Sequence, residues 1–433
     1  MDMKRNEILP GVYLTALKTD KFKTSCMSVS FLTQLNRETA AMNAVIPMVL
    51  RRGTQKYPDM DALAARLDDL YGTAIEPSIR RIGEIQCVGF FASFPESRYL
   101  PEKTDIMAET AQLLAELLLT PNTRGGLLLP DYVESEKEKL LEIIHSRIND
   151  KQSYALQRCI EEMCAYEDYA TTRYGDEESA RSIHYTKLTK HYRNLISTSP
   201  MEIFYCGSRE YSEVCATVKD AFAALPRGEI NDDIGTEIRM NAVEDAPRET
   251  IEELNVSQGK LVMGFRLGEC MEEPDLAAIR VFNTVYGGGV TSKLFENVRE
   301  KLSLCYYASS LLETHKGLMF VSSGVSPDNF EAAKTEILAQ LDAIRQGEVS
   351  EHELSSAKSG FASDMRALMD SQGALEGYYL SNAIDGIELD PMELAALAED
   401  VTLQDVVGVA KSVVLDEIYF LKGNSQEAFD DGE

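Results

Sequence analysis

The chain has 433 residues, and its 44% apolar and 26% charged side chains are typical of a folded protein of two or three domains. Its net charge of −28 argues against nucleic acid and anionic membranes as partners, because phosphate binding needs clustered Lys and Arg. The longest strongly apolar stretch, residues 44–50, is far shorter than the roughly 20 residues that a membrane span needs, and no apolar segment of an export signal follows Lys4 and Arg5.

The first half of the chain begins with a strand pattern and continues into helices. In the helical segment that precedes Gly72, Leu63, Leu67 and Leu70 fall on one face, and glycine is common just after a helix end. The predicted elements are, in chain order, a strand at 26–33, helices at 38–51 and 59–71, strands at 73–81 and 84–94, and long helical stretches from 102 to about 163.

The second half repeats this order about 230 residues later, which indicates a duplication. Ser350 and Glu353 form a capping-box pattern at the start of one of its helices. The predicted elements are a strand at 260–267, helices at 275–286 and 292–302, strands at 304–313 and 317–326, and helices from 327 almost to the end. In the helix at 292–302, we expect Leu294, Phe295, Val298 and Leu302 to be buried.

A polar, acidic segment at 226–247 lies between the repeats and is the predicted linker. We therefore expect an N-terminal domain at 1–225 and a C-terminal domain at 248–433. Because runs of helices follow the strands without strict alternation, the predicted fold class is α+β, with two tandem homologous units, each a mainly antiparallel sheet packed with helices.

The acidic charge is concentrated in the second half. Residues 1–230 carry 28 basic and 33 acidic side chains, a balance of −5, and the remaining 15 basic and 38 acidic side chains give 231–433 a balance of −23. An acidic half favours basic peptides or a basic partner surface, although a solvated acidic surface is the alternative. The eight cysteines are scattered and form no CxxC pair, so we expect reduced thiols and a cytoplasmic protein.

A Gly-rich segment in the second half resembles a signature of the insulinase-like (pitrilysin) metallopeptidase family. In the second domain of that family, a glycine turn leads into S-x-L-F-x-x-V-R-E-K, and a Tyr follows the Arg by seven residues. Here Gly287, Gly288 and Gly289 precede such a segment, and Arg299 and Tyr306 keep the spacing. The order and size of the two units also match the family, so the resemblance covers nearly the whole chain.

The resemblance implies that Arg299 and Tyr306 hold substrate near the scissile bond, with the glycine turn beside them. A guanidinium presents fixed donors to peptide carbonyls, and a phenol can donate to a developing oxyanion. Family sites also bind peptides by adding a strand to a sheet edge. The alternatives are a surface arginine paired with Glu296 or Glu300, and a tyrosine that packs on the core.

The first half departs from the family where the zinc motif H-x-x-E-H belongs. Counted back from Gly53-Thr54, both histidine positions are changed, to Ala44 and Met48, and the general-base glutamate is replaced by Pro47. Glu136 is the candidate for the third ligand, but one carboxylate cannot hold catalytic zinc, which needs three protein ligands. None of the five histidines forms another metal motif, so we expect no metal or cofactor on this chain.

These residues together predict a non-catalytic subunit of a heterodimeric zinc peptidase. The expected partner is an insulinase-like subunit that carries H-x-x-E-H and the zinc, and the expected substrate is a peptide. The chain resembles the degenerate members of bacterial gene pairs, one type of which is called an elongation-factor-P modification-associated protein. A stand-alone peptide-binding or scaffold protein of the same fold is the alternative, and an active zinc protease is not expected.

Overall fold

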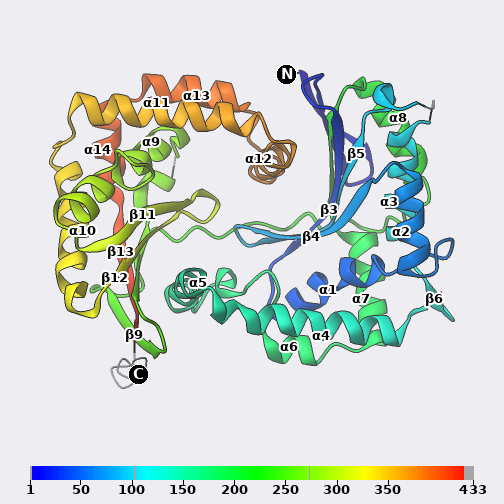
Figure 1. Cartoon of the computed structure of the whole chain (residues 1–433), viewed down its shortest axis with the longest axis horizontal. Coiled ribbons are helices and arrows are strands. Elements are labelled where there is room, and N and C mark those ends of the chain that lie inside the picture. Colours follow the sequence, from blue (N-terminus) through cyan, green and yellow to red (C-terminus); the bar gives the residue numbers. More distant parts are fainter. Residues whose placement is uncertain (1, 102–103, 273, 424–433) are drawn as a thin grey trace, which may run out of the picture. The chain divides into compact units, whose positions relative to one another are not determined.

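The computed structural model describes residues 2–101, 104–272 and 274–423 and divides the chain into two compact units (Figure 1). The first unit consists of Met1–His145, Thr171–Gly235 and Ser371–Ile387, and the second of Ser146–Ala170, Thr236–Asp370 and Glu388–Glu433. Both units are therefore discontinuous in sequence, whereas the predicted domains followed the duplication and were continuous.

The first unit is built on a six-stranded sheet in the order β1-β2-β8-β3-β5-β4. All neighbouring strands are antiparallel except β2 and β8, which are parallel. The central strand β3 is buried over most of its length because its residues pack on both faces, so it lacks simple alternation. The strands are β1 (Asp2–Leu9), β2 (Val12–Lys18), β3 (Thr24–Gln34), β4 (Ala74–Ile82), β5 (Ile85–Pro95) and β8 (Met201–Gly207).

Apolar helices cover this sheet and enclose the core of the first unit. Helix α1 packs on β5 and α7, while α3 packs on β5 and α8. The helices are α1 (Ala40–Leu50), α2 (Met60–Asp69), α3 (Ile106–Leu119), α4 (Pro130–Ser146), α6 (Glu177–Arg181), α7 (Tyr185–Thr198) and α8 (Tyr211–Ala221), and a small hairpin of β6 (Thr123–Arg124) and β7 (Leu127–Leu128) joins α3 to α4.

The second unit is built on a five-stranded sheet in the order β11-β12-β10-β13-β9, antiparallel except for the pair β13 and β9. Its strands are β9 (Arg248–Leu254), β10 (Gly259–Arg266), β11 (Cys305–Glu313), β12 (Leu318–Val325) and β13 (Val414–Gly423). Its helices include α9 (Leu276–Tyr286), α10 (Phe330–Arg345), α11 (Glu351–Leu368), α13 (Pro391–Asp400) and α14 (Leu403–Ser412). The predicted fold class is confirmed.

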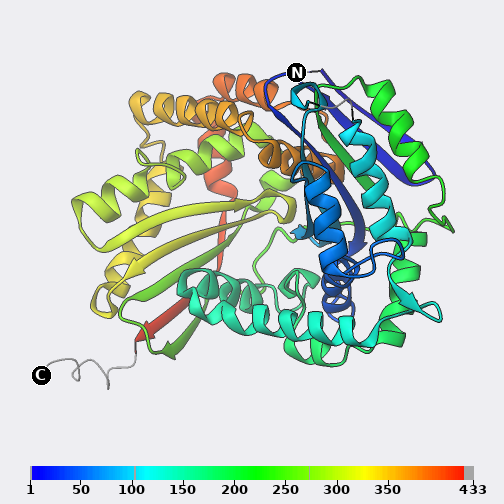
Figure 2. The same ribbon diagram turned by 45° about the vertical axis from the view of Figure 1, so that its right-hand side comes forward.

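The two halves of the sequence exchange one helix each. Helix α12 (Gln372–Asp385) comes from the second half but packs on β3 and β8 of the first unit, where Tyr379 stacks on Phe204 with ring centroids 6.1 Å apart. Helix α5 (Lys151–Met163) comes from the first half but packs on β10 and β13 of the second unit (Figure 2). Each sheet is thus covered in part by a helix from the other half.

The predicted strands and helices near both repeat starts are confirmed within a few residues. Two predictions were too coarse. The helical stretches predicted from 102 to about 163 are three helices, α3 to α5, because the β6–β7 hairpin and a turn at Arg147–Asn149 separate them, and residues 102 and 103 lie outside the described residues. The described part of the chain also ends in a central strand, β13, instead of a helix. No helix in the described ranges is long and apolar enough to cross a membrane.

Candidate functional site

Arg299 lies on a short π-helical segment, η5 (Leu294–Lys301), between the glycine turn and β11. The wide turn is closed by the Leu302 N–H, which donates to the Asn297 carbonyl five residues earlier at 3.2 Å. Leu294 and Val298 are fully buried, as predicted, but Leu302 is 51% exposed, so its prediction as a core residue was wrong. The wider turn shifts Leu302 off the buried face, and such segments occur often at functional sites.

The Arg299 side chain remains partly open to solvent, with 40% of its surface exposed. Its guanidinium lies over the Phe295 ring, 4.6 Å from the centroid, and one of its nitrogens is 3.5 Å from the Glu300 carboxylate. Exposed contacts of this kind contribute little energy and leave most guanidinium donors free to bind a ligand. The alternative of a pairing with Glu300 is therefore present but does not bury the side chain.

Tyr306 projects into solvent with 74% of its surface exposed, so it is not a core residue. It belongs to the edge strand β11, at an irregularity in the ladder where Cys305 pairs with Val325 and Ala308 pairs with Ser323. Such a bulge changes the direction in which side chains project from a sheet edge. The preceding Ser303 has a φ of +50°, a conformation that a non-glycine residue rarely adopts and that is typical of functional turns.

The glycine turn packs tightly at its first two positions. A Cβ atom on Gly287 would lie 2.7 Å from the backbone nitrogen of Ser310 in β11, and one on Gly288 would lie 3.0 Å from Thr284. The Ser310 N–H donates to the Gly287 carbonyl at 3.0 Å, which fixes the turn to β11. Gly289 faces open space. The turn thus positions η5 beside β11, and only Gly289 leaves room for a ligand to approach the backbone.

The outer edge of β11 is open to pairing with another chain only before Ser310, where the glycine turn meets the strand. From Cys305 to Leu312 the strand has no charged residue and no proline, the features that usually protect an edge. The edge strands elsewhere carry them: β4 contains Pro77 and two arginines, and β9 contains Arg248 and three glutamates. An extended peptide can therefore add to β11 next to Tyr306.

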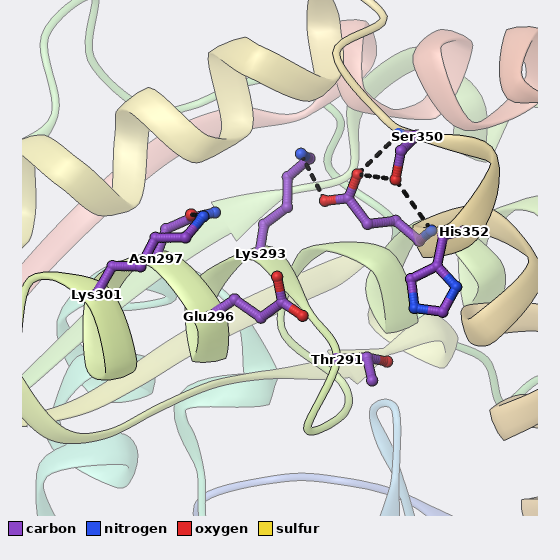
Figure 3. Close-up of a pocket in the computed structure, with 8 residues that line it drawn as sticks. Thr291, Lys293, Glu296, Asn297, Lys301, Ser350 and His352 are labelled. Carbon is purple, nitrogen blue, oxygen red and sulfur yellow. Dashed lines mark hydrogen bonds and ion pairs between the residues drawn. The ribbon is translucent and has the colours of Figure 1, made fainter.

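A polar cavity of about 350 Å³ lies on another side of η5, against the start of α11 (Figure 3). The Lys293 ammonium lies 2.8 Å from the Glu353 carboxylate, and Glu353 also accepts bonds from the backbone and hydroxyl of Ser350. This confirms the predicted capping box and fixes η5 to α11. The cavity is lined by Thr291, Lys293, Glu296, Asn297, Lys301, Ser350, His352 and Glu353.

The altered zinc motif lies on α1 in the first unit, and its side chains do not fit a metal. Ala44 is fully buried and has no donor atom, Pro47 is buried within the helix, and Met48 offers a thioether that suits zinc poorly. Glu136 on α4 is buried, but its carboxylate accepts from Arg52 at 3.0 Å and from Lys139 at 2.7 Å. In the described parts of the chain, no three His, Cys, Asp or Glu side chains are arranged to hold a metal ion.

A buried polar chain beside Ala44 was not predicted. His191 on α7 lies with Nε2 2.6 Å from Asn43 Oδ1, and Asn43 Nδ2 donates to Gln86 Oε1 at 2.9 Å. Gln86 in turn donates to the Ala40 carbonyl at 3.0 Å. Burial lowers the pKa of His191, so its imidazole stays neutral and Nε2 donates. This series of hydrogen bonds connects α1 to β5 and α7. No local sequence pattern predicts it, because its members are far apart in sequence.

The family-model match and a curated relative decide the family. Residues 182–361 match the model described as "Peptidase M16 inactive domain". The chain is 32% identical over 414 residues to the "Probable inactive metalloprotease YmfF" of Bacillus subtilis. The matched region covers 95% of this chain and 96% of that relative. The chain belongs to the M16 peptidase family. The resemblance to insulinase-like peptidases is thereby confirmed, and the name of that relative describes the Bacillus subtilis protein as an inactive metalloprotease.

Another relative is similar in sequence, and solved structures share the fold of this M16 chain. An "Uncharacterized zinc protease" of Streptomyces coelicolor is 23% identical, and the matched region covers 87% of this chain and 80% of that protein. The crystal structure of a conserved protein from Enterococcus faecalis is 27% identical and superposes with a TM-score of 0.87 over 99% of this chain and 100% of that chain. The peptidase M16 inactive domain from Pseudomonas fluorescens, 17% identical, shares the fold with a TM-score of 0.79 over 98% and 99% of the two chains.

Proposed function

We propose that this M16 chain is the non-catalytic subunit of a heterodimeric zinc peptidase and binds peptide through Arg299, Tyr306 and the edge of β11. The observation that carries the proposal is the contrast between the two units. In the second unit, Arg299 and Tyr306 are exposed beside an unprotected strand edge. In the first unit, the residues at the metal-motif positions cannot hold zinc.

The chemistry of the two exposed groups suits peptide binding. A guanidinium donates several hydrogen bonds in a fixed geometry to carbonyl oxygens, and a phenol can donate to an oxyanion that develops during peptide cleavage. Backbone pairing with β11 supplies affinity without demanding a sequence. In this proposal the partner subunit carries H-x-x-E-H and the zinc, so this chain needs neither. The eight free thiols support a cytoplasmic setting.

The test is cleavage of a fluorogenic peptide by this chain mixed with an M16 subunit from the same genome that carries H-x-x-E-H. We expect no cleavage and no stoichiometric zinc for the chain alone, and activity for the mixture. Arg299→Ala and Tyr306→Phe should each lower turnover about 10²–10³-fold in an intact complex, the usual loss for one transition-state donor. If Arg299 binds mainly ground-state substrate, the loss appears in KM instead.

Matched controls separate a site effect from a surface effect. Tyr166→Phe changes a tyrosine that is 75% exposed elsewhere in the second unit, and Arg366→Ala changes an exposed arginine at the end of α11. Both should leave the rate unchanged. Wild-type rates for Arg299→Ala and Tyr306→Phe in an intact complex would contradict the proposal.

The second candidate function is a stand-alone peptide-binding or scaffold protein. The open edge of β11 is compatible with it, since strand addition needs no partner enzyme. Copurification from the native cell distinguishes the two: the scaffold elutes alone or as a homodimer, whereas the peptidase subunit elutes with a zinc-containing M16 chain.

A further inference from the structure

The carboxylate of Glu136, the candidate for the third ligand of the metal motif, is deeply buried. Only 5% of its side chain is exposed. An ionised carboxylate at such a site is costly unless a positive charge compensates it. In a zinc site the metal ion would supply that positive charge. The question here is therefore which group of the protein supplies it in place of a metal.

Two cations surround the carboxylate. The Arg52 guanidinium donates to Glu136 Oε1 at 3.0 Å, and the Lys139 ammonium donates to the same oxygen at 2.7 Å. Lys139 is half exposed, so solvent screens its charge, whereas only 24% of the Arg52 side chain is exposed. Arg52 is therefore the main source of compensating charge.

The position of Arg52 is determined by more than its charge. Its guanidinium lies over the Tyr132 ring, 4.8 Å from the centroid, and donates to the Ser135 hydroxyl at 3.4 Å. Tyr132, Ser135, Glu136 and Lys139 share one face of α4, at spacings that place side chains together on a helix. Arg52 itself follows α1, the helix that carries Ala44 and Met48. The cation thus joins the segment after α1, the helix with the altered motif positions, to α4, the helix of the candidate third ligand.

We propose that Arg52 is a built-in cation that takes the place of a metal ion at Glu136 and keeps this half-site closed to metal even when its missing ligands are restored. The inference does not depend on the partner subunit or on Arg299 and Tyr306. It explains how the Glu136 carboxylate is accommodated in the interior: Glu136 is one half of a partly buried ion pair that joins the segment after α1 to α4. Metal binding would have to break that pair and place a divalent ion beside a guanidinium.

The experiment restores the two histidine positions and then removes the cation. Ala44→His/Met48→His is compared with Ala44→His/Met48→His/Arg52→Met, and the zinc affinity of each full-length protein is measured by competition with a chromophoric chelator. Pro47 is left unchanged because its position belongs to the general base and not to a ligand. Removing Arg52 should tighten zinc binding about 10-fold or more, the range over which groups next to metal ligands act.

Lys137→Met in the two-histidine background is the control, because it removes a positive charge next to Glu136 in sequence that pairs with Glu134 instead. It should leave the zinc affinity unchanged. Equal zinc affinities with and without Arg52 would overturn the proposal.

A second measurement on the otherwise unchanged protein avoids the risk that histidine does not fit at the buried Ala44 position. Urea unfolding midpoints are measured for Arg52→Met, Glu136→Gln and the double variant. We expect each single variant to lower the midpoint, and the double variant to lower it by clearly less than the sum. The Arg52 Nε–H already lacks a hydrogen-bond partner among the described residues, so losing Glu136 leaves the guanidinium poorly satisfied. Additive shifts would contradict a coupled pair.

Discussion

Four charged side chains meet inside the second unit, where solvent does not reach them. The Arg266 guanidinium donates to Asp416 and to Glu167, both at 2.7 Å, and the Lys316 ammonium is 2.7 Å from the other oxygen of Glu167. Arg266 and Lys316 are fully buried. Glu167 follows α5, whereas Arg266 and Asp416 lie at the ends of β10 and β13, so the cluster fixes the exchanged segment to the second sheet.

Breaking this cluster at its centre should be strongly destabilising. Arg266→Met leaves two buried carboxylates without their main cation, and loss of one partner of a buried pair costs about 3–5 kcal/mol. Urea unfolding followed by circular dichroism measures the change. Arg239→Met, at a more exposed arginine nearby, should change stability by less than about 1 kcal/mol. An equal effect of the two substitutions would contradict the assigned role.

The same cluster predicts a loss of stability in acid. Burial alone would raise the pKa of Glu167, but the hydrogen bonds and charges of Arg266 and Lys316 outweigh it and hold that pKa below its usual range. A depressed carboxyl pKa stabilises the folded state above the unfolded value of about 4.3, and this contribution disappears as the pH falls through the folded pKa. The stability difference between wild type and Glu167→Gln should therefore shrink from pH 6 to pH 3 in urea titrations. A constant difference would mean that Glu167 does not titrate with folding.

At the scale of elements, α12 belongs to the first unit although it lies near the end of the chain. Leu375, Tyr379 and Leu380 are buried, and Leu380 joins a cluster with Leu32 and Cys87 of the first sheet. Glu376 is fully buried, pairs with Arg80 on β4 and accepts from the Ser28 hydroxyl at 2.8 Å. This helix therefore stabilises strands that precede it by more than 150 residues.

We expect Leu380→Ala to weaken the first sheet and not the second. Truncating a buried leucine costs about 2–5 kcal/mol, and hydrogen–deuterium exchange should become faster in β3 and β8 while β10 and β12 keep their protection. Leu394→Ala in α13, which packs on α9 and α11, should give the opposite pattern. Faster exchange confined to the second unit in Leu380→Ala would contradict the placement of α12.

Local elements were predictable, and their assignment to a sheet was not. Apolar periodicity located α2 and η5 well, because it reports which face of a segment is buried. It does not report which sheet covers that face, so the exchange of α5 and α12 was missed. The loss of the zinc ligands at Ala44 and Met48 could be predicted from the spacing of the motif. The cation at Glu136 could not, because Arg52 and Glu136 are brought together only by the packing of α4 near the end of α1.

At the scale of the whole molecule, the exchanged helices connect the two units independently of the segment between them. Residues 226–247 form no helix or strand, and Val243 within them is 43% exposed. We expect a chain with an engineered protease site between Asn241 and Ala246 to stay associated after cutting, because α5 remains on the second sheet and α12 on the first. The cut protein should elute from size-exclusion chromatography at the volume of the intact chain and separate only in denaturant. Separate fragments in native buffer would contradict this.

The late position of α12 has a consequence for how the protein is made. A ribosome releases the chain from its N-terminus, and domains generally fold in that order as they emerge. The first sheet cannot receive α12, one of its covering helices, until residues 372–385 have left the ribosome, long after its last strand, β8, has emerged. Until then the apolar face around Phe204 and Leu32 is exposed to chaperones and to neighbouring nascent chains. Completion of the first unit is therefore a late event in synthesis, and a message truncated before codon 372 encodes a first half whose sheet lacks this helix.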